Sequence, residues 1–584
     1  MIIENIKSPK DVKALPLEAL PTLADEIRCA LITKLSAYGG HFGSNLGVVE
    51  ATVALHRVFD SPNDKIIFDV SHQCYAHKML TGRADAYLDA GKYSSVAGYS
   101  APYESEHDIF NMGHTSTSVS LALGMAKARD LKGENYDVIA LIGDGSLSGG
   151  EALEALNHAG EFDGGLIIVV NDNDMSIAEN HGGLYRSLLS LRQSGGKSEN
   201  NIFKALGLDY MFVEGGNDVL SLVKAFESVR GTKKPIVVHI CTTKGKGYSF
   251  AEIERERWHA TSPFNIETGE RLYSKNGKDS YAELSATYLL DKMKTMPELV
   301  SITAATPFVA GWTKQRRDIA GAQFIDVGIA EEHALAMASG IAKAGGVPVW
   351  AVNSTFLQRT YDQMSHDVCL NESPVTTLVF NSSIYGKSDV THLGIYDIPM
   401  ISNIPNLKYL APTNADEYIA MLEWSITKKH GPVAIKVPFG KAVLSGECVC
   451  DDFSTPKYEV KKQGEGVCIL ALGSFFPLGE QVCSELEKCG INATLINPMF
   501  INEFDTKTLE ALKENHSLVI TLEDGVVSGG FGEKIASFYG PSSMRVINYG
   551  FSRKFPTNYT LEGILEENRL TPSQIIEDVQ KIVK

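Results

Sequence analysis

No uninterrupted apolar stretch of about 18 residues, the length that a membrane-spanning helix requires, occurs in this sequence. The first residues also lack the basic and then apolar layout of a secretion signal. Both absences argue against a protein that spans a membrane or is exported. We therefore expect a cytoplasmic protein without a membrane partner.

Positive charge is in deficit, because 54 Lys and Arg residues stand against 71 Asp and Glu residues, a net charge of −17. Such a balance repels the phosphate backbone of nucleic acids and anionic membrane surfaces. We therefore expect no nucleic-acid partner. An anionic small ligand would need a local cationic group or a metal ion to bind.

Cysteines spaced as Cys-x-x-Cys are absent, although the chain has nine cysteines. Only Cys448 and Cys450 lie close together in the sequence. This distribution argues against a zinc site built from paired cysteines and fits a reducing compartment. We interpret the scattered thiols as core residues.

What the sequence does contain is an alternation of helical patterns with short apolar runs that end in turn residues. Runs of this length, bounded by turns, predict buried parallel strands with helices between them. They cover residues 136–142, 166–170, 235–241, 347–352, 375–380, 432–437, 467–472 and 518–522.

The length of 584 residues exceeds what one hydrophobic core can organise. Polar stretches near residues 262–279 and 445–464 are rich in turn-forming residues, which is typical of linkers. We therefore predict an α/β protein of three α/β domains with mostly parallel sheets. Their expected bounds are 1–270, 280–444 and 460–584.

Polar tripeptides follow two successive predicted strands of the first domain. Gly143-Asp144-Gly145 follows one strand and Asn171-Asp172-Asn173 follows the next. Ligands of parallel sheets bind beyond the carboxyl ends of the strands, where these residues fall. Asp144 offers an anionic oxygen and Asn173 a neutral one, a combination that suits Mg²⁺. Either tripeptide alone is a common turn, but together they predict a site for a metal ion and a diphosphate.

Seven longer motifs occur along the chain: Gly40–Gly47, Asp69–Arg83, Gly113–Ser118, Asn173–Ile177, Thr243–Tyr248, Asp326–His333 and Ser354–Gln363. In this order they resemble the motifs of the 1-deoxy-D-xylulose-5-phosphate synthase family, within the transketolase group of thiamine diphosphate enzymes. The resemblance implies a transketolase-like thiamine diphosphate-binding fold and a homodimer. The first domain would bind diphosphate and Mg²⁺, and the second the aminopyrimidine ring. The third would be of the transketolase C-terminal type.

The resemblance also implies roles for single residues. The implied magnesium ligands are Asp144, Asn173 and the backbone carbonyl of Met175. The implied cofactor-binding residues are His72, Gly113, His114, Thr115, Gly145, Ser146, Asn173, Ile177, Lys244, Tyr248, Glu331 and Phe356.

Catalysis by thiamine diphosphate requires a protein carboxyl group that is hydrogen-bonded to a nitrogen of the aminopyrimidine ring, because this bond helps the cofactor to form its carbanion. Glu331 matches that position, and Phe356 matches the ring that stacks on the aminopyrimidine. Glu332 stands where the family usually has glutamine, and two adjacent glutamates also suit a plain helix start. Four histidines match positions around the reactive carbon, where they could carry protons. They are His41, His72, His259 and His392.

The chain departs from the family where the acceptor would bind. Two arginines that would hold a phosphate bidentately are replaced by Asn381 and Phe439. Asn353 stands where the family has a tyrosine, and Ser388 stands where it has an aspartate on the acceptor side. The segment between residues 180 and 207 is also much shorter than in the family. The cations that could rebuild an anion site are Arg359, Lys387, Lys436 and Lys441.

Three functions follow from these observations. The resemblance implies that pyruvate is decarboxylated and its two-carbon unit passed to glyceraldehyde 3-phosphate, a step of isoprenoid and thiamine biosynthesis. The altered acceptor positions favour a second possibility, a related enzyme with another acceptor, including an unphosphorylated one, or with a transketolase-like donor. The third is a non-catalytic homologue. Intact Glu331, Asp144 and Asn173 argue against it.

Overall fold

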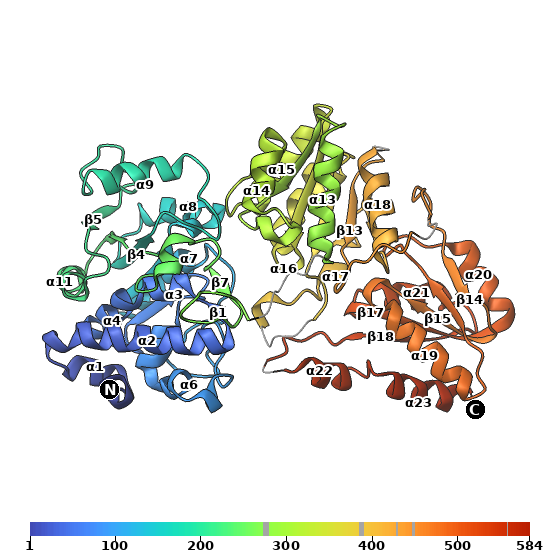
Figure 1. The fold of residues 1–584 in the computed structure, drawn as a ribbon, viewed down its shortest axis with the longest axis horizontal. Coiled ribbons are helices and arrows are strands. Elements are labelled where there is room, and N and C mark those ends of the chain that lie inside the picture. The colour runs from blue at the N-terminus through green and yellow to red at the C-terminus, as the bar shows by residue number, and fades with distance from the viewer. Residues whose placement is uncertain (273–278, 385–389, 428–429, 447–449, 558, 584) are drawn as a thin grey trace. The chain divides into compact units, whose positions relative to one another are not determined.

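The computed structural model describes residues 1–584 except 273–278, 385–389, 428–429, 447–449, 558 and 584. The chain divides into two compact units, each described here by itself (Figure 1). The first unit comprises Met1–Lys275 and Val327–Ala330, and the second Asn276–Asp326 and Glu331–Lys584. Among the described residues, no helix combines the length and the apolar character needed to cross a membrane.

The first unit is built on a five-stranded parallel sheet with the order β2-β3-β4-β6-β5. Its strands are β2 Lys65–Phe68, β3 Val138–Gly143, β4 Leu166–Asp172, β5 Asp209–Val213 and β6 Pro235–Cys241. The three strands predicted for this part of the chain are therefore confirmed. Register pairs Gly143 with Asn171 and Asp172 with Cys241, so β3, β4 and β6 end at one edge of the sheet.

Helices cover both faces of this sheet, because alternate strand residues point to opposite sides. Ile139 and Leu141 pack with residues of α2, α4 and α11, whereas Ala140 and Ile142 pack with residues of α7 and α8. The helices are α1 Pro9–Ala14, α2 Leu20–Tyr38, α3 Gly43–Gly47, α4 Val49–Val58, α5 Tyr75–Lys78, α6 Asp85–Leu88, α7 Ser118–Lys132, α8 Gly150–Ala159, α9 Leu184–Gln193, α10 Ile202–Ala205, α11 Val219–Val229 and α12 Ser249–Ile253.

A separate antiparallel ribbon joins β1 Gly40–His41 to β7 Ala260–Thr261. Gly40 pairs with Thr261 and His41 with Ala260. Gly39 has a φ of +79°, and a Cβ there would lie 2.7 Å from the Thr261 carbonyl oxygen. Glycine is therefore required where α2 turns into the ribbon.

The second unit contains two sheets. A six-stranded parallel sheet has the order β12-β13-β11-β10-β8-β9, and a five-stranded sheet has the order β14-β16-β15-β17-β18 with β14 antiparallel. The strands of the first are β8 Leu299–Thr303, β9 Phe324–Asp326, β10 Val347–Asn353, β11 Thr376–Phe380, β12 Lys408–Leu410 and β13 Val433–Lys436. Those of the second are β14 Glu459–Lys462, β15 Gly466–Ala471, β16 Thr494–Asn497, β17 His516–Val526 and β18 Arg545–Phe551. All five strands predicted for this region are present.

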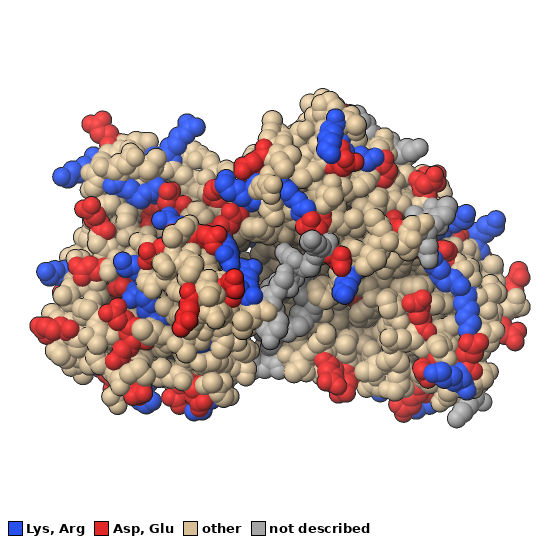
Figure 2. Space-filling view, in the orientation of Figure 1, with Lys and Arg blue, Asp and Glu red and all other residues tan. Residues whose placement is uncertain are grey.

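Helices of the second unit pack on these sheets around two hydrophobic cores. They are α13 Tyr281–Met293, α14 Lys314–Ala320, α15 Glu331–Lys343, α16 Ser354–Leu357, α17 Asp397–Ile401, α18 Ala415–Thr427, α19 Phe476–Lys488, α20 Thr506–Asn515, α21 Phe531–Tyr539, α22 Leu561–Glu567 and α23 Pro572–Val583. Acidic and basic side chains are interspersed over the visible surface of both units (Figure 2). The predicted α/β fold with mostly parallel sheets is confirmed.

Candidate active site

The predicted metal ligands of the first unit lie at the carboxyl edge of its sheet. Asp144 directly follows β3, and its backbone N–H donates to the Asn171 carbonyl at 3.0 Å. The Asp144 Oδ2 accepts the Met175 backbone N–H at 3.1 Å and the Asn180 side-chain amide at 2.8 Å. The loop that carries Asn173 and Met175 is therefore folded against the Asp144 carboxylate.

Two features of this edge fit a bound cation. The buried Oδ1 of Asn173 has no hydrogen-bond partner among the described residues, a costly arrangement unless a ligand occupies it. Burial, with the nearby Asp172 carboxylate, raises the pKa of Asp144 to about 7. A divalent ion beside the Asp144 carboxylate would favour its ionised form. One carboxylate and one amide oxygen are a donor set that suits Mg²⁺, so the residues present fit the implied metal.

Small residues line the approach to this site. A Cβ on Gly145 would lie 2.8 Å from the Ser176 Oγ and 3.0 Å from the Ser176 Cα, so only glycine allows the two segments to meet this closely. Next to it, the Ser146 carbonyl accepts the Ser116 hydroxyl at 2.8 Å. The Asp69 carboxylate accepts backbone N–H groups of Ser116 at 2.8 Å and Ser118 at 3.0 Å. The predicted cofactor residues Gly113, His114 and Thr115 precede this anchored turn.

Lys244 provides a buried cation near the same edge. Its Nζ donates to the carbonyl of Ser176, and burial lowers the pKa of its ammonium group to about 8. The Asp144 carboxylate acts in the opposite direction and favours the charged form. A cation in this place is available to offset the charge of a diphosphate, and this role of Lys244 stays a prediction.

Three of the four predicted histidines come together in the first unit. The ring centroids of His41 and His72 are 5.1 Å apart, those of His41 and His259 are 5.7 Å apart, and those of His72 and His259 are 5.3 Å apart. Asn45 donates to the backbone carbonyls of His41 at 2.9 Å and His72 at 2.8 Å, which fixes their spacing. Burial lowers the pKa of His259 well below its usual range, so this ring is neutral near pH 7.

Tyr99 completes this cluster and was not among the predicted residues. Its ring lies 5.5 Å from that of His41 in an edge-to-face arrangement. The next residue, Ser100, donates its backbone N–H to the Ser71 hydroxyl at 2.8 Å, and Ser71 directly precedes His72. Tyr99 and His72 are therefore held together through a hydrogen bond between their sequence neighbours Ser100 and Ser71.

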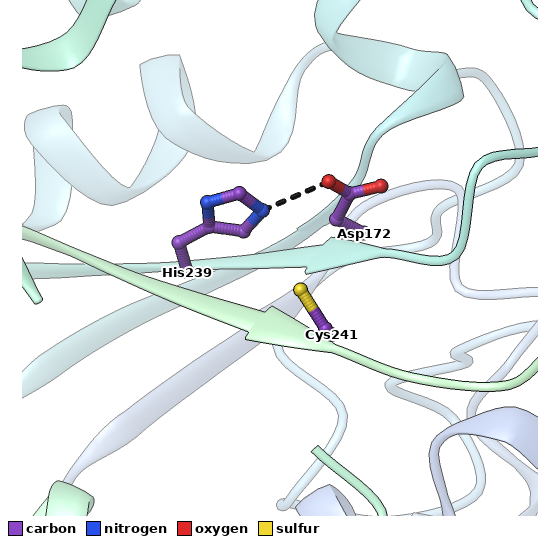
Figure 3. Close-up of side chains that lie close together, drawn as sticks. All are labelled: Asp172, His239 and Cys241. Atoms are coloured by element: carbon purple, nitrogen blue, oxygen red, sulfur yellow. Dashed lines mark hydrogen bonds and ion pairs between the residues drawn. The ribbon is translucent and has the colours of Figure 1, made fainter. Parts of the chain in front are cut away.

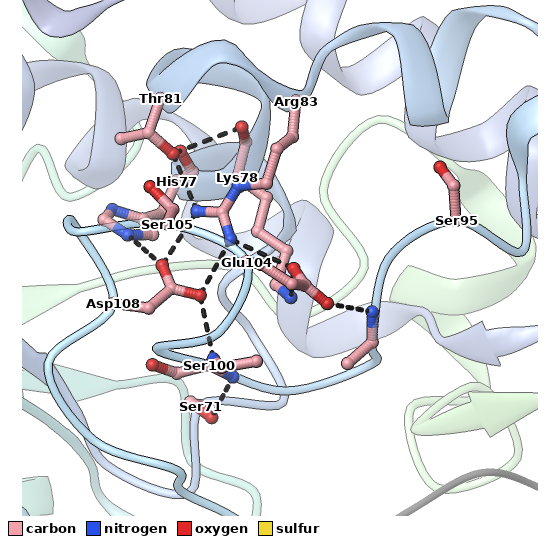
Figure 4. Close-up of polar contacts among 12 residues, drawn as sticks. Ser71, His77, Lys78, Thr81, Arg83, Ser95, Ser100, Glu104, Ser105 and Asp108 are labelled. Carbon is pink, nitrogen blue, oxygen red and sulfur yellow. Dashed lines mark hydrogen bonds and ion pairs between the residues drawn. The ribbon is translucent and has the colours of Figure 1, made fainter. Parts of the chain in front are cut away.

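A buried ion network holds the loop that carries Tyr99 (Figure 4). Asp108 accepts the Ala101 backbone N–H at 2.8 Å, and Glu104 accepts the Ala97 backbone N–H at 2.5 Å. Both carboxylates contact the Arg83 guanidinium, at 2.7 Å for Asp108 and 3.1 Å for Glu104. Further contacts come from the Lys78 Nζ to Glu104 at 2.6 Å and from the His77 Nε2 to Asp108 at 3.0 Å.

Two further residues predicted to bind the cofactor, Tyr248 and Ile177, lie outside the contacts described so far. The Tyr248 hydroxyl donates to the Ile266 carbonyl at 2.9 Å, and its ring packs 5.3 Å from Phe42 and 5.2 Å from Trp258. The structure thus gives Tyr248 a packing role, and a contact with the cofactor stays a prediction. Ile177 is half-buried in the loop after β4.

The second unit holds the predicted carboxyl activator. Glu331 begins α15 and is 4% exposed, and its Oε2 lies 3.8 Å from the Arg359 Nη1. Burial raises the pKa of Glu331 to about 7, although Arg359 acts against this. In the same unit the rings of Phe356 and His392 are 5.6 Å apart, and the His392 Nδ1 lies 2.9 Å from the Thr391 hydroxyl.

The altered acceptor positions also lie in the second unit. Asn353 ends β10 and Asn381 follows β11, and the Asn381 amide donates to the Asn353 carbonyl oxygen. Asn381 has a φ of +52°, a conformation that asparagine tolerates better than most residues. Phe439 is 59% exposed. The other two predicted substrate residues, Lys387 and Ser388, lie outside the described residues.

Lys436 does not help to rebuild an anion site, contrary to the expectation from sequence. Its Nζ is buried 2.9 Å from the Asp397 Oδ2 and 3.5 Å from the Asp524 Oδ1. The Tyr409 hydroxyl also donates to the Asp397 carboxylate. The charge of Lys436 is therefore neutralised by two buried aspartates that lie far from it in the sequence.

Comparisons with known proteins agree with this arrangement. The sequence model described as 1-deoxy-D-xylulose-5-phosphate synthase matches residues 3–200. The transketolase models of the thiamine diphosphate binding, pyrimidine binding and C-terminal domains match residues 115–286, 278–441 and 456–575.

Curated relatives named 1-deoxy-D-xylulose-5-phosphate synthase match over almost their whole length. The protein of Caldanaerobacter subterraneus subsp. tengcongensis is 39% identical over 99% of this chain and 98% of its own. That of Alkaliphilus oremlandii is 38% identical over 99% and 98%. That of Halalkalibacterium halodurans is 37% identical over 100% and 99%. The chain therefore belongs to the 1-deoxy-D-xylulose-5-phosphate synthase family.

Proposed function

We propose that this chain is a thiamine diphosphate- and magnesium-dependent transferase that makes 1-deoxy-D-xylulose 5-phosphate, the product named in its relatives. The donor would be pyruvate, which loses CO₂, and the acceptor glyceraldehyde 3-phosphate. When bound, thiamine diphosphate supplies a carbanion that can attack a carbonyl carbon. The protein groups bind, orient and move protons around it.

The observation that carries this proposal is the edge of the first sheet. There the buried Asp144 carboxylate, the buried Oδ1 of Asn173 without a described partner, and the buried ammonium of Lys244 occur together. This set would hold Mg²⁺ through Asp144 and Asn173, and Lys244 would offset diphosphate charge. A bare structural core would not favour a carboxylate and an amide oxygen buried in this way.

Proton handling is assigned to two groups of residues. Burial raises the pKa of Glu331 to about 7, so much of this carboxyl group stays protonated near neutral pH and can donate a hydrogen bond to an aminopyrimidine nitrogen. His41, His72 and His259 would exchange protons with carbonyl and hydroxyl oxygens of the substrates. The neutral ring of His259 is suited to accept a proton or a hydrogen bond.

A second candidate function keeps the donor and changes the acceptor. The positions that match the family's phosphate-binding arginines are a neutral Asn381, bonded to Asn353, and the exposed phenyl ring of Phe439. Lys436 is already paired with two aspartates. These observations favour an acceptor that has no phosphate, with Arg359 as the remaining described cation among the predicted substrate residues.

Further properties are proposed from the sequence and from the resemblance. They are a homodimer, a cytoplasmic location, a contribution to isoprenoid and thiamine biosynthesis, and domain bounds of 1–270, 280–444 and 460–584. Size-exclusion chromatography with light scattering would measure the oligomeric state directly.

The deciding experiment follows pyruvate consumption by the full-length chain with thiamine diphosphate and Mg²⁺. Glyceraldehyde 3-phosphate and unphosphorylated glyceraldehyde are offered separately, and product masses are recorded. Asp144→Asn should lose turnover and metal binding, whereas Glu154→Gln, at an exposed position of α8, should keep both. Turnover with the phosphorylated aldehyde supports the first proposal, and turnover only with glyceraldehyde supports the second. If pyruvate is not consumed with either acceptor, both are wrong.

A further inference from the structure

We propose that Arg192 is a positioning residue that fixes the metal-binding loop around Asn173 and thereby sets the affinity of the site for Mg²⁺. This inference rests on the proposed function, since it assumes that Asn173 binds the ion. Arg192 lies near the end of α9. This helix belongs to the segment between residues 180 and 207, which is short in this chain.

The geometry is a bridge across the proposed ligand. The Arg192 Nη1 lies 2.6 Å from Oδ1 and 2.8 Å from Oδ2 of Asp172, and its Nη2 lies 2.7 Å from the Asp174 Oδ1. These two aspartates flank Asn173 in the sequence. The Arg192 guanidinium therefore bonds to the residues on both sides of Asn173. Its planar, fixed geometry holds two carboxylates more rigidly than an ammonium group would.

The loop needs such a support because its backbone is unusual. Asp174 has a φ of +61°, in the left-handed region that non-glycine residues seldom adopt. Its backbone N–H donates to the Asp172 Oδ1 at 3.2 Å. Without the bridge to Arg192, the exposed Asp174 would lose its 2.7 Å ion pair and keep this longer local bond to Asp172. The carbonyl of Asn173 is held more loosely, by the Arg255 Nη1 at 3.4 Å.

Asp172 is the buried anchor of this bridge. Its Oδ2 also accepts a hydrogen bond from the His239 Nε2 at 2.9 Å (Figure 3). The Tyr210 hydroxyl lies 2.8 Å from the His239 Nδ1. Asp172, His239 and Cys241 lie close enough together to suggest a metal site of their own. However, Arg192, His239 and Tyr210 already engage both carboxylate oxygens and both ring nitrogens. The cluster therefore serves to hold the loop and not to bind a second ion.

Two effects of removing Arg192 oppose each other, which makes the test decisive. Loss of a nearby cation alone would strengthen binding of Mg²⁺, because like charges repel. Loss of loop order would weaken it, since residues that orient metal ligands typically change metal affinity by about 10- to 100-fold. The proposal predicts that the second effect dominates.

The experiment compares Arg192→Gln with Arg186→Gln in the full-length chain. Arg186 is an exposed residue of the same helix and serves as the matched control. Isothermal titration calorimetry measures Mg²⁺ binding at a fixed concentration of thiamine diphosphate. We expect the apparent Kd for Mg²⁺ to rise about 10- to 100-fold in Arg192→Gln, with kcat recovered at saturating Mg²⁺. Arg192→Lys, which keeps the charge without the fork, should recover part of the affinity, and Arg186→Gln should match wild type.

An unchanged or lower Kd in Arg192→Gln would overturn the proposal. If that variant does not fold, Asp174→Asn replaces it, because this exposed carboxylate can be changed without disturbing the buried Asp172 pair. The same direction of change, about two- to tenfold, is then expected, as an exposed pair contributes less. A wild-type chain that binds neither Mg²⁺ nor thiamine diphosphate would instead remove the proposed function itself.

Discussion

The Arg359 guanidinium lies 3.8 Å from the Glu331 carboxylate, yet it does not make that carboxyl group a strong acid. Burial raises the pKa of Glu331 to about 7 in spite of this cation. A longer and less direct contact than a bidentate ion pair leaves the desolvation of the carboxylate as the larger effect. Burial thus keeps a large share of the Glu331 carboxyl group protonated near neutral pH, although Arg359 favours its ionised form.

Replacing Glu331 with glutamine should therefore abolish activity and stabilise the folded protein at neutral and alkaline pH. Between pH 4.5, the ordinary pKa, and about 7, the folded protein retains a proton that the unfolded chain has lost, so its stability falls as the pH rises. Glu331→Gln removes this slope. In the cofactor-free protein we expect it to raise the free energy of unfolding at pH 8 by up to about 3 kcal/mol, with no gain below pH 4.5, and to abolish turnover.

Urea unfolding at a series of pH values measures this effect, with the exposed Glu298→Gln as control. If the difference in free energy of unfolding between Glu331→Gln and wild type is the same at pH 4 and at pH 8, Glu331 does not retain its proton in the folded state.

Tyr99→Phe should weaken the use of substrate without affecting the cofactor. The Tyr99 ring lies beside His41, and a hydrogen bond from its hydroxyl to the substrate would contribute about 0.5–1.5 kcal/mol, so kcat/KM should fall about 3- to 10-fold. Affinity for thiamine diphosphate, measured by calorimetry, should stay the same. Tyr103→Phe, at a more exposed position of the same loop, is the control. Equal kinetics for both variants would exclude a substrate contact of the Tyr99 hydroxyl.

Phe439→Arg should shift the chain toward phosphorylated acceptors. The position is exposed, so the new side chain can extend without repacking the core. A charge-assisted hydrogen bond contributes about 1.5–3 kcal/mol, so the ratio of kcat/KM for glyceraldehyde 3-phosphate over glyceraldehyde should rise about tenfold or more. Leu370→Arg adds the same charge at another exposed position of the unit and should leave this ratio unchanged. If Phe439→Arg leaves this ratio of kcat/KM values unchanged, the phosphate of the acceptor does not bind near residue 439.

Lys436→Met should destabilise the second unit strongly. It would leave the carboxylates of Asp397 and Asp524 buried without their cation, a change that typically costs about 3–5 kcal/mol. The double variant with Asp524→Asn should recover part of this loss, because one buried charge is removed as well. Denaturant unfolding measures both. A small effect in the single variant would mean that the aspartates take up protons at little cost.

The sequence was sufficient to predict what depends on local pattern. Apolar runs bounded by turns predicted the strands β3, β4 and β6, and the ends of these strands carry Asp144 and Asn173 as expected. The resemblance of short motifs indicated the histidines that cluster around His41. In each case the residues follow regular elements whose geometry is known in advance.

Contacts between segments far apart in the sequence were not predictable in the same way. Lys436 lies within a predicted strand, but its partners Asp397 and Asp524 come from other elements, so its neutralised charge could not be foreseen. Tyr99 lies on a loop without periodic pattern, and contacts with distant segments, namely the ion network of Arg83 and the Ser100–Ser71 hydrogen bond, hold it beside His41. The signal that could have pointed to this loop is the acidic run from Glu104 to Asp108.

The ribbon of β1 and β7 has a consequence for the order in which the protein matures on the ribosome. It joins backbone positions about 220 residues apart, and at a synthesis rate of about 5–20 residues per second the second partner emerges about 10–45 s after the first. During that interval the segment with His41 cannot form its contact with His259, because His259 has not yet been synthesised. The histidines predicted to be catalytic can therefore be assembled only after all five strands of the first unit's sheet have been synthesised.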